Sequence, residues 1–197
     1  FGTQYNPETE ITITSGGTQA LFTAIMATVS KGDEVIIFDP AYDSYAPAVE
    51  LAGGVPIHIA LMPPNFNIDW NEVQQTISPQ TRMIIINNPG NPSSQVLTKE
   101  DMIALQKITD GTNIIVLSDE VYEHIIFDGQ QHQSVSMFPQ LAARSLVVYS
   151  FGKTFHATGW KMGYILGPQM LMTEFRKVHQ FNVFSANTPI QAALSVF

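Results

Sequence analysis

The sequence predicts an α/β protein built on a mainly parallel, seven-stranded sheet with helices on both faces. Short runs of β-branched residues alternate with segments of helical spacing, and most runs are bounded by Gly, Pro, Asn or Asp. Because consecutive parallel strands need a crossover of about a dozen residues, this alternation implies three α/β/α layers. The seven expected strands are 11–14, 34–38, 55–61, 82–87, 113–118, 145–149 and 162–166.

Helices are expected in the connections between these strands. The last of four segments with helical spacing opens with Thr98, followed by Asp101, which is a capping signal. Connection 150–161 instead contains glycine and has no helical period, so we expect the seventh strand to run antiparallel to the sixth. Near the end of the chain, Thr188 as N-cap and Pro189 as first helical residue predict one more helix. The four segments are 18–29, 42–52, 69–77 and 98–109.

The composition excludes several classes of protein. The 197 residues are 45% hydrophobic and 13% charged, which is typical of one compact domain rather than a disordered chain. The net charge is −8 and the basic residues are scattered, which argues against nucleic acid as a partner. Without cysteine there is no disulfide framework or thiolate metal site, and we expect no metal. The sequence has no apolar run long enough to span a membrane, so we expect a cytoplasmic protein.

The ends of the first two expected strands carry a glycine turn and an aromatic ring. Ligands of open α/β sheets bind outside the carboxyl ends of the strands, so these positions are informative. Gly16 and Gly17 lead directly into a helix whose first N–H groups could bind phosphate, although such a pair is also common in ordinary tight turns. Tyr42 follows the second strand, where its ring either faces a ligand or packs at the rim.

The ends of the fourth and fifth expected strands carry an amide and an acid. Asn91 lies between Pro89 and Pro92, which restrict the backbone and so the direction of the amide. Asp119 follows an apolar run, and a carboxylate buried there needs a partner; the alternative is a helix N-cap. The nearby Tyr122 adds a phenol. Other polar residues of this stretch we interpret as solvated or structural: Glu120, Glu123 and His124.

The loop after the sixth strand carries Ser150, Lys153 and Lys161. It could be a hairpin loop with two solvated lysines, or it could place cations beside the other strand ends. Together, the groups at these five strand ends predict a binding site for a planar, phosphorylated, cationic heteroaromatic aldehyde. Pyridoxal 5′-phosphate (PLP) has this chemistry, since it requires a lysine amine, an acid beside the ring nitrogen and a phosphate site.

Four motifs resemble those of class I/II aminotransferases of the aspartate aminotransferase fold, which are fold-type I PLP enzymes. They occur in family order between residues 11 and 189, and they resemble most closely the subgroup acting on methionine, glutamine, kynurenine and aromatic amino acids. In place of the usual Thr-Gly after the Asn-Pro pair, this chain has Ser93-Ser94, as in the kynurenine and glutamine subgroup. The motifs are Ser15-Gly16-Gly17-Thr18-Gln19-Ala20-Leu21, Asn88-Pro89-Gly90-Asn91-Pro92, Ser118-Asp119-Glu120-Val121-Tyr122, and Ser150-Phe151-Gly152-Lys153 with Thr158-Gly159-Trp160-Lys161-Met162-Gly163-Tyr164.

The resemblance implies a role for each matching position. Lys153 would form the Schiff base with the cofactor and carry the proton between the substrate Cα and the cofactor C4′. Asp119 would keep the pyridine nitrogen protonated, and Asn91 and Tyr122 would donate to the phenolic oxygen. Tyr42 would stack on the ring. The phosphate-binding set would be Gly17, Thr18, Gln19, Ser150 and Lys161.

The resemblance also implies what the whole enzyme does and what this chain lacks. We expect a homodimeric enzyme that transfers an amino group between an amino acid and a 2-oxo acid by a ping-pong mechanism. Alternatives are other fold-type I chemistry, such as a β-lyase or decarboxylase, and a non-catalytic PLP-binding module. Family members are longer, so we interpret residues 1–197 as the PLP-binding large domain, without the N-terminal arm and the C-terminal small domain.

Overall fold

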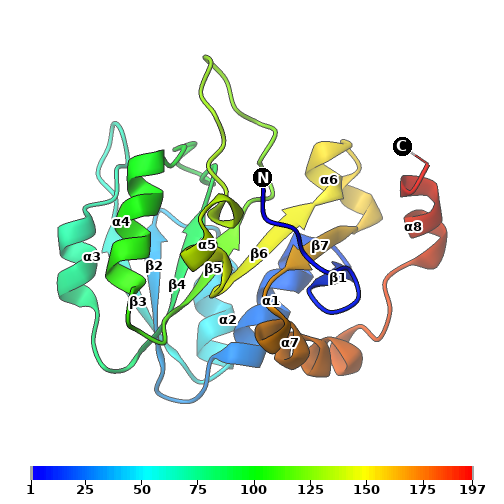
Figure 1. The fold of residues 1–197 in the computed structure, drawn as a ribbon, viewed down its shortest axis with the longest axis horizontal. Helices are drawn as coiled ribbons and strands as arrows, with labels where there is room; N and C mark the ends of the chain where they lie inside the picture. The colour runs from blue at the N-terminus through cyan, green and yellow to red at the C-terminus, as the bar shows by residue number, and fades with distance from the viewer. Residues whose placement is uncertain (1, 197) are drawn as a thin grey trace.

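A single seven-stranded sheet forms the centre of the molecule in the computed structural model, which describes residues 2–196. The strand order is β1-β7-β6-β5-β4-β2-β3, and β7 is antiparallel to both of its neighbours while the remaining pairs are parallel (Figure 1). The strands are β1 (Ile11–Thr14), β2 (Glu34–Asp39), β3 (Val55–Ala60), β4 (Thr81–Asn87), β5 (Ile115–Asp119), β6 (Ser145–Ser150) and β7 (Gly163–Leu166).

The predicted fold class is confirmed. Each expected strand is present with its ends within two residues of the prediction, and β7 has the expected antiparallel direction. Alternate residues of the strands face opposite layers, as the pleat requires. Val35 and Ile37 of β2 belong to one core, whereas Ile36 belongs to the other.

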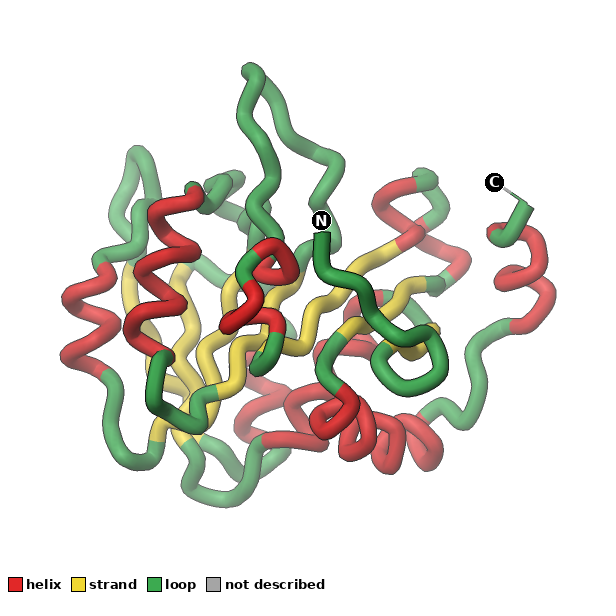
Figure 2. Tube along the Cα trace, viewed as in Figure 1, coloured by secondary structure: helices red, strands yellow, loops and turns green. Residues whose placement is uncertain are grey.

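Helices cover both faces of the sheet (Figures 1 and 2). One core joins the sheet to α1 (Gly17–Thr28), α2 (Tyr45–Leu51) and α7 (Gln169–Asn182), whose buried residues include Leu21, Val49 and Phe175. The other core joins it to α3 (Trp70–Thr76), α4 (Lys99–Thr109) and α5 (Pro139–Ala142) through residues such as Met102 and Leu141. The three-layer α/β/α prediction is therefore correct.

The five predicted helices correspond to α1 to α4 and to α8 (Thr188–Leu194), and two details of capping can be compared with the sequence. Thr98 and Asp101 form the expected capping box at α4, with the Thr98 side chain accepting from the Asp101 N–H. At α8 the predicted N-cap is wrong by one residue, because Asn187 accepts from the Ile190 N–H and Thr188 is already helical. An Asn side chain satisfies the free N–H groups of a first turn as well as Thr does.

Several elements were not expected from the sequence. The connection between β6 and β7 contains α6 (Phe151–Thr154) and η2 (Thr158–Trp160), each about one turn long and so without a readable period. A second 3-10 turn, η1 (Val135–Met137), precedes α5. The 14-residue helix α7 is the largest omission, since it packs against α1.

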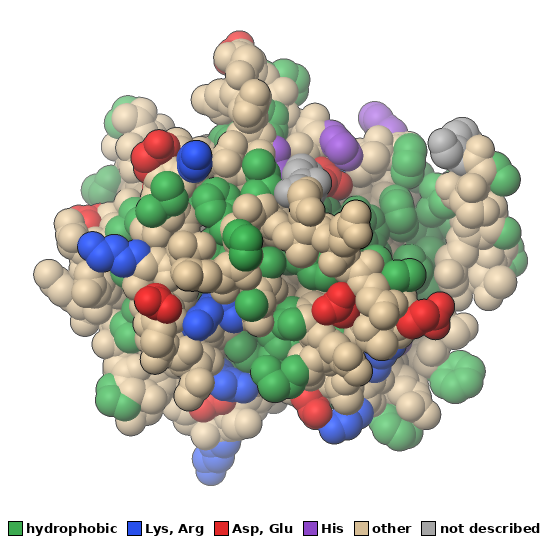
Figure 3. All heavy atoms as spheres, viewed as in Figure 1, with side chains coloured by type: hydrophobic (Ala, Val, Ile, Leu, Met, Phe, Trp, Pro, Cys, Tyr) green, Lys and Arg blue, Asp and Glu red, His purple; other side chains and the backbone are tan. Residues whose placement is uncertain are grey.

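The surface agrees with the scattered distribution of charge in the sequence. On the face drawn in Figure 3, Lys and Arg side chains lie apart from one another and are interspersed with Asp and Glu. Within residues 2–196, no helix combines the length and apolar character needed to cross a membrane. The long segment between β5 and η1 rises above the strand ends in Figure 1, beside the site described next.

Candidate functional site

A cavity of about 220 Å³ lies where the carboxyl ends of β4, β5 and β6 meet the N-terminus of α1. This is the edge at which parallel α/β sheets bind ligands. The cavity walls include nine of the ten positions that the sequence singled out. They are Gly17, Thr18, Tyr42, Asn91, Asp119, Tyr122, Ser150, Lys153 and Lys161.

Asp119 is the buried acid of the cavity. It is the last residue of β5, is 3% exposed, and accepts hydrogen bonds from the Tyr45 hydroxyl (2.6 Å) and the Val121 N–H (3.3 Å). Burial raises the pKa of the Asp119 carboxyl from 3.8 to about 6, although both hydrogen bonds act in the opposite direction. Glu120 raises this pKa further and Lys153 lowers it. The N-cap alternative is wrong, because a turn rather than a helix follows β5.

Tyr45 is a functional neighbour that sequence reasoning missed. Its ring is buried at the start of α2, and its hydroxyl donates to Asp119. Burial raises the pKa of the Tyr45 phenol well above its usual value, so the hydroxyl keeps its proton. The ring also lies edge-on to Tyr42, with 5.6 Å between ring centroids. The available signal was the three-residue spacing from Tyr42, which places both rings on one side of a helical turn.

The amide side of the cavity is built by two asparagines. The Asn91 N–H donates to Asn87 Oδ1 (2.6 Å), and Asn87 Nδ2 donates to the Asp119 carbonyl (3.0 Å). Asn87 lines the cavity and was not predicted. This pair links the loop carrying Asn91 to the strand carrying the acid. Tyr122 lies on the same wall, with Lys153 Nζ 5.2 Å from the centroid of its ring.

The opposite end of the cavity is made by the turn before α1. Gly16 has φ 84° and ψ 170°, a conformation that is essentially restricted to glycine. A Cβ on Gly16 would lie 3.6 Å from Lys161 Nζ, and one on Gly17 would lie 3.0 Å from Val121. The absence of both side chains therefore leaves a cradle between backbone N–H groups and a lysine ammonium, which suits a phosphate dianion.

Gln19 was predicted to belong to the phosphate-binding set, and the structure places its side chain elsewhere. Its Oε1 accepts from the Ser15 N–H (3.0 Å), and its Nε2 donates to Thr23 Oγ1 (2.6 Å) and lies 3.2 Å from His179 Nδ1. The side chain thus connects the glycine turn to α7 and does not line the cavity. Only the backbone N–H of Gln19, in the first turn of α1, remains available to an anion.

The donors of the cavity fit a phosphorylated, cationic heteroaromatic aldehyde. The glycine cradle and Lys161 offer an anion site, and Asp119 offers a buried carboxylate for a ring N–H. Lys153 offers a primary amine, and Tyr42 an aromatic face. Each of these groups lines the same cavity, as the receptor predicted from the sequence requires.

Comparison with known proteins identifies the family. The sequence model of the family described as aminotransferase class I and II matches residues 1–196. The chain belongs to this family. Among curated relatives, the methionine aminotransferase of Escherichia coli is 51% identical over 195 residues, which are 99% of this chain and 50% of that protein. Human kynurenine–oxoglutarate transaminase 1 is 37% identical over 99% of this chain and 49% of its own length.

The solved aminotransferase structures have the same fold. The crystal structure of a methionine aminotransferase from Escherichia coli superposes with a TM-score of 0.97 at 52% identity, covering 98% of this chain and 51% of that one. The chain therefore spans about half the length of the relatives that it matches. The resemblance drawn from the four motifs is confirmed at the level of family and fold.

Proposed function

We propose that this aminotransferase-family chain binds PLP in the cavity at the carboxyl ends of β4, β5 and β6, and serves the transfer of an amino group between an amino acid and a 2-oxo acid. One observation carries the proposal: a buried carboxylate, a lysine amine and a glycine cradle all line one cavity. Enzymes of this family use PLP, whose pyridinium ring, when bound, withdraws electrons from the substrate Cα.

Lys153 is the proposed point of covalent attachment and the proposed proton carrier. Its primary amine would hold the cofactor through the aldehyde carbon, with loss of the aldehyde oxygen as water, and once displaced by the substrate amine it would move a proton between the substrate Cα and the cofactor C4′. The supporting geometry is its place at the end of α6, on the cavity wall and beside the Tyr122 ring.

Asp119 is the proposed partner of the ring nitrogen. An ionised carboxylate in contact with a protonated ring nitrogen stabilises the proton on that nitrogen. Tyr45 and the Val121 N–H already orient the carboxylate, and a cationic partner would lower its pKa from the raised value. Asn91 and Tyr122 would donate to the phenolic oxygen from the adjacent wall, and Tyr42 would cover one face of the ring.

The phosphate would occupy the opposite end. The N–H groups of Gly17, Thr18 and Gln19 precede the first intrahelical hydrogen bonds of α1, and Lys161 brings a positive charge to the same turn. Ser150, at the end of β6, lines the cavity and adds a hydroxyl. Backbone donors and a lysine together hold a phosphate without depending on any one side chain.

We further propose that residues 1–197 are the PLP-binding large domain of a longer, cytoplasmic and homodimeric enzyme. The support is that the matched relatives are about twice as long as this chain. The proposed donors are methionine, glutamine, aromatic amino acids or kynurenine, because relatives named for methionine and kynurenine are among the most similar.

The test is transamination by the full-length protein with these donors and a 2-oxo acid acceptor. We expect formation of the corresponding 2-oxo acid and amino acid in equal amounts over many turnovers. Release of ammonia and pyruvate would instead indicate a β-lyase, and release of CO₂ a decarboxylase. PLP binding without any of these products would favour a non-catalytic module. The 197-residue chain by itself is expected to bind PLP weakly and to give no sustained turnover.

A rate measurement tests the role of Asp119 in the same protein. Asp119→Asn removes the charge with little change in volume, so the first half-reaction should slow by about 10²-fold or more while some PLP still binds. Single-turnover absorbance of the bound cofactor measures this rate. A rate close to that of the parent protein would contradict the proposed role.

A further inference from the structure

A second carboxylate, Glu120, is buried on the other side of the backbone from Asp119. It is 0% exposed, and its Oε1 accepts from Ser118 Oγ (2.8 Å) and from the Val135 N–H (3.1 Å). Its Oε2 accepts from the Tyr149 hydroxyl (2.9 Å) and lies 2.8 Å from His132 Nε2. A buried carboxylate with this many donors satisfies its hydrogen-bonding capacity entirely within the protein.

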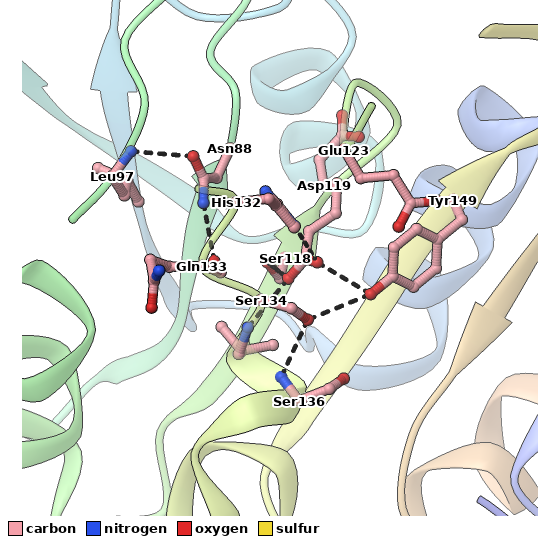
Figure 4. A network of polar contacts seen from close by, with 12 residues as sticks. Asn88, Leu97, Ser118, Asp119, Glu123, His132, Gln133, Ser134, Ser136 and Tyr149 are labelled. Carbon is pink, nitrogen blue, oxygen red and sulfur yellow. Dashed lines mark hydrogen bonds and ion pairs between the residues drawn. The ribbon is translucent and has the colours of Figure 1, made fainter. Parts of the chain in front are cut away.

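These contacts close a long segment of the chain on itself. Segment 121–135 follows Glu120 directly and rises above the strand ends in Figure 1. It returns to the same carboxylate through the His132 side chain and the Val135 N–H. Figure 4 shows the side chains of His132, Ser134 and Tyr149 close together, with Ser134 Oγ 3.2 Å from the Tyr149 hydroxyl. One side chain therefore holds the beginning and the end of the segment together.

The closed segment also holds the neighbouring loop. Asn88 is fully buried, its Nδ2 donates to the Gln133 carbonyl (2.8 Å), and its Oδ1 accepts from the Leu97 N–H (2.9 Å), as drawn in Figure 4. Loop 88–97 carries Asn91, and segment 121–135 carries Tyr122, so both residues of this cavity wall belong to backbones joined at Gln133.

We propose that Glu120 is a positioning residue of the cavity. Its carboxylate closes segment 121–135 and, through Gln133 and Asn88, sets where Tyr122 and Asn91 lie on the cavity wall. Glu120 touches no ligand in this arrangement, because its side chain lies outside the cavity lining. The proposal rests on the proposed PLP site only for its effect on cofactor binding; the order of the two backbones is independent of it.

The test compares Glu120→Gln with Asp128→Asn. Both replace a carboxylate of this part of the chain by an amide, but Asp128 is exposed to solvent whereas Glu120 is buried. In Glu120→Gln, an NH₂ replaces one of the two oxygens, so either the Val135 N–H or the Tyr149 hydroxyl and His132 lose the oxygen that they contact. Leaving such buried donors without an acceptor weakens the closure.

Hydrogen exchange without added cofactor is the first measurement. Glu120→Gln should increase exchange in 121–135 and 88–97 by about tenfold, while amides in α1 and α7 keep their protection. Asp128→Asn should leave all four regions unchanged. Unchanged exchange in Glu120→Gln would overturn the proposal. Uniformly faster exchange would also overturn it, because that result indicates general loss of stability.

Cofactor binding is the second measurement. In Glu120→Gln the dissociation constant for PLP should rise about tenfold, and the pH midpoint of the bound cofactor's absorbance change should move upward, because donors to the phenolic oxygen are displaced. A general loss of stability would not move that midpoint. If the parent protein binds no PLP, the proposed function fails, and exchange alone decides the positioning role.

A double variant tests whether His132 acts through Glu120. If their contact carries the effect, Glu120→Gln combined with His132→Gln should change exchange no more than the worse single variant. Additive effects would show that His132 holds the segment independently, and would overturn the assignment of the closure to the Glu120 carboxylate.

Discussion

Backbone groups form one end of the cavity, whereas buried side chains form the other. At the anion end, the turn before α1 presents backbone N–H groups, and Lys161 and Thr18 are exposed to solvent. At the acid end, Asp119, Tyr45 and Glu120 are at most 3% exposed and are held by side-chain hydrogen bonds. A backbone cradle tolerates solvent, whereas a carboxylate in the proposed role of partner to a ring nitrogen acts strongly only where water is excluded.

This difference predicts that the ends respond differently to substitution. Substitutions at the anion end should lower the affinity for PLP by the free energy of the hydrogen bond that they remove or of the backbone strain that they introduce. Changes at the acid end should also alter the dependence of stability on pH, since burial there raises a pKa. Lys153 lines the same cavity and provides the largest expected effect.

Lys153→Ala should abolish the covalent cofactor adduct trapped by borohydride, because a Schiff base requires a primary amine. Lys161→Ala is the matched control, since it removes the other lysine of the cavity and should weaken phosphate retention without preventing the adduct. Mass spectrometry of the reduced peptides decides the assignment. A pyridoxyl group found on Lys161 would show that Lys161, and not Lys153, forms the Schiff base.

Asp119→Asn should stabilise the protein without cofactor at neutral pH. The folded-state pKa of Asp119 is raised from 3.8 to about 6, so its contribution to stability is fully present below pH 3.8 and is lost as the pH rises through 6. An Asn side chain does not ionise, so the variant does not lose this stability as the pH rises. Its free energy of unfolding should exceed that of the parent by up to about 3 kcal/mol above pH 6 and by much less near pH 4.

Urea unfolding at a series of pH values measures this difference. Tyr45→Phe should move the midpoint of the parent profile upward, because the lost hydrogen bond favoured the ionised form. A difference between parent and Asn variant that is the same at pH 4 and pH 7 would show that Asp119 does not titrate as described.

Gly16→Ala should lower the free energy of unfolding by about 1–3 kcal/mol, because φ 84° with ψ 170° is strained for any residue with a Cβ. Gly111→Ala is the control, since its φ of 67° is also positive but nothing lies near an added Cβ. Both variants should lose stability in urea unfolding. Only Gly16→Ala should weaken PLP binding, and equal affinities in the two variants would argue against the cradle.

Tyr42→Phe is expected to have the smallest effect. It removes the contact between the Tyr42 hydroxyl and Thr18 Oγ1 (3.1 Å), which is solvent-exposed, and keeps the ring. The dissociation constant for PLP should rise by about twofold to fivefold. Tyr42→Ala, which also removes the ring, should have a larger effect in the same titration. Equal effects would mean that the ring does not cover the cofactor.

The sequence alone predicted the sheet. The alternation of β-branched runs with helical segments, the glycine turns and the helix caps are all signals carried by residues close together in the chain. The strand limits, the reversed β7 and the capping box at Thr98 all depend on residues close together in the chain. It missed α7 and misplaced one N-cap, at α8. Helix α7 is stabilised by packing on α1, about 150 residues earlier, and local periodicity contains little of that information.

The features of the site also divide into those that the sequence predicted and those that only the structure shows. The sequence determined which residue types stand at the strand ends, and thus the cradle, the lysines and the acid. Only the tertiary structure decided that Tyr45 donates to Asp119 from 74 positions away and that the Gln19 side chain faces α7. It also decided that Glu120, interpreted from the sequence as solvated or structural, is buried and accepts from the Val135 N–H. The physical reason is that burial and hydrogen-bond partners depend on which distant segments pack together, and a single sequence does not specify them locally.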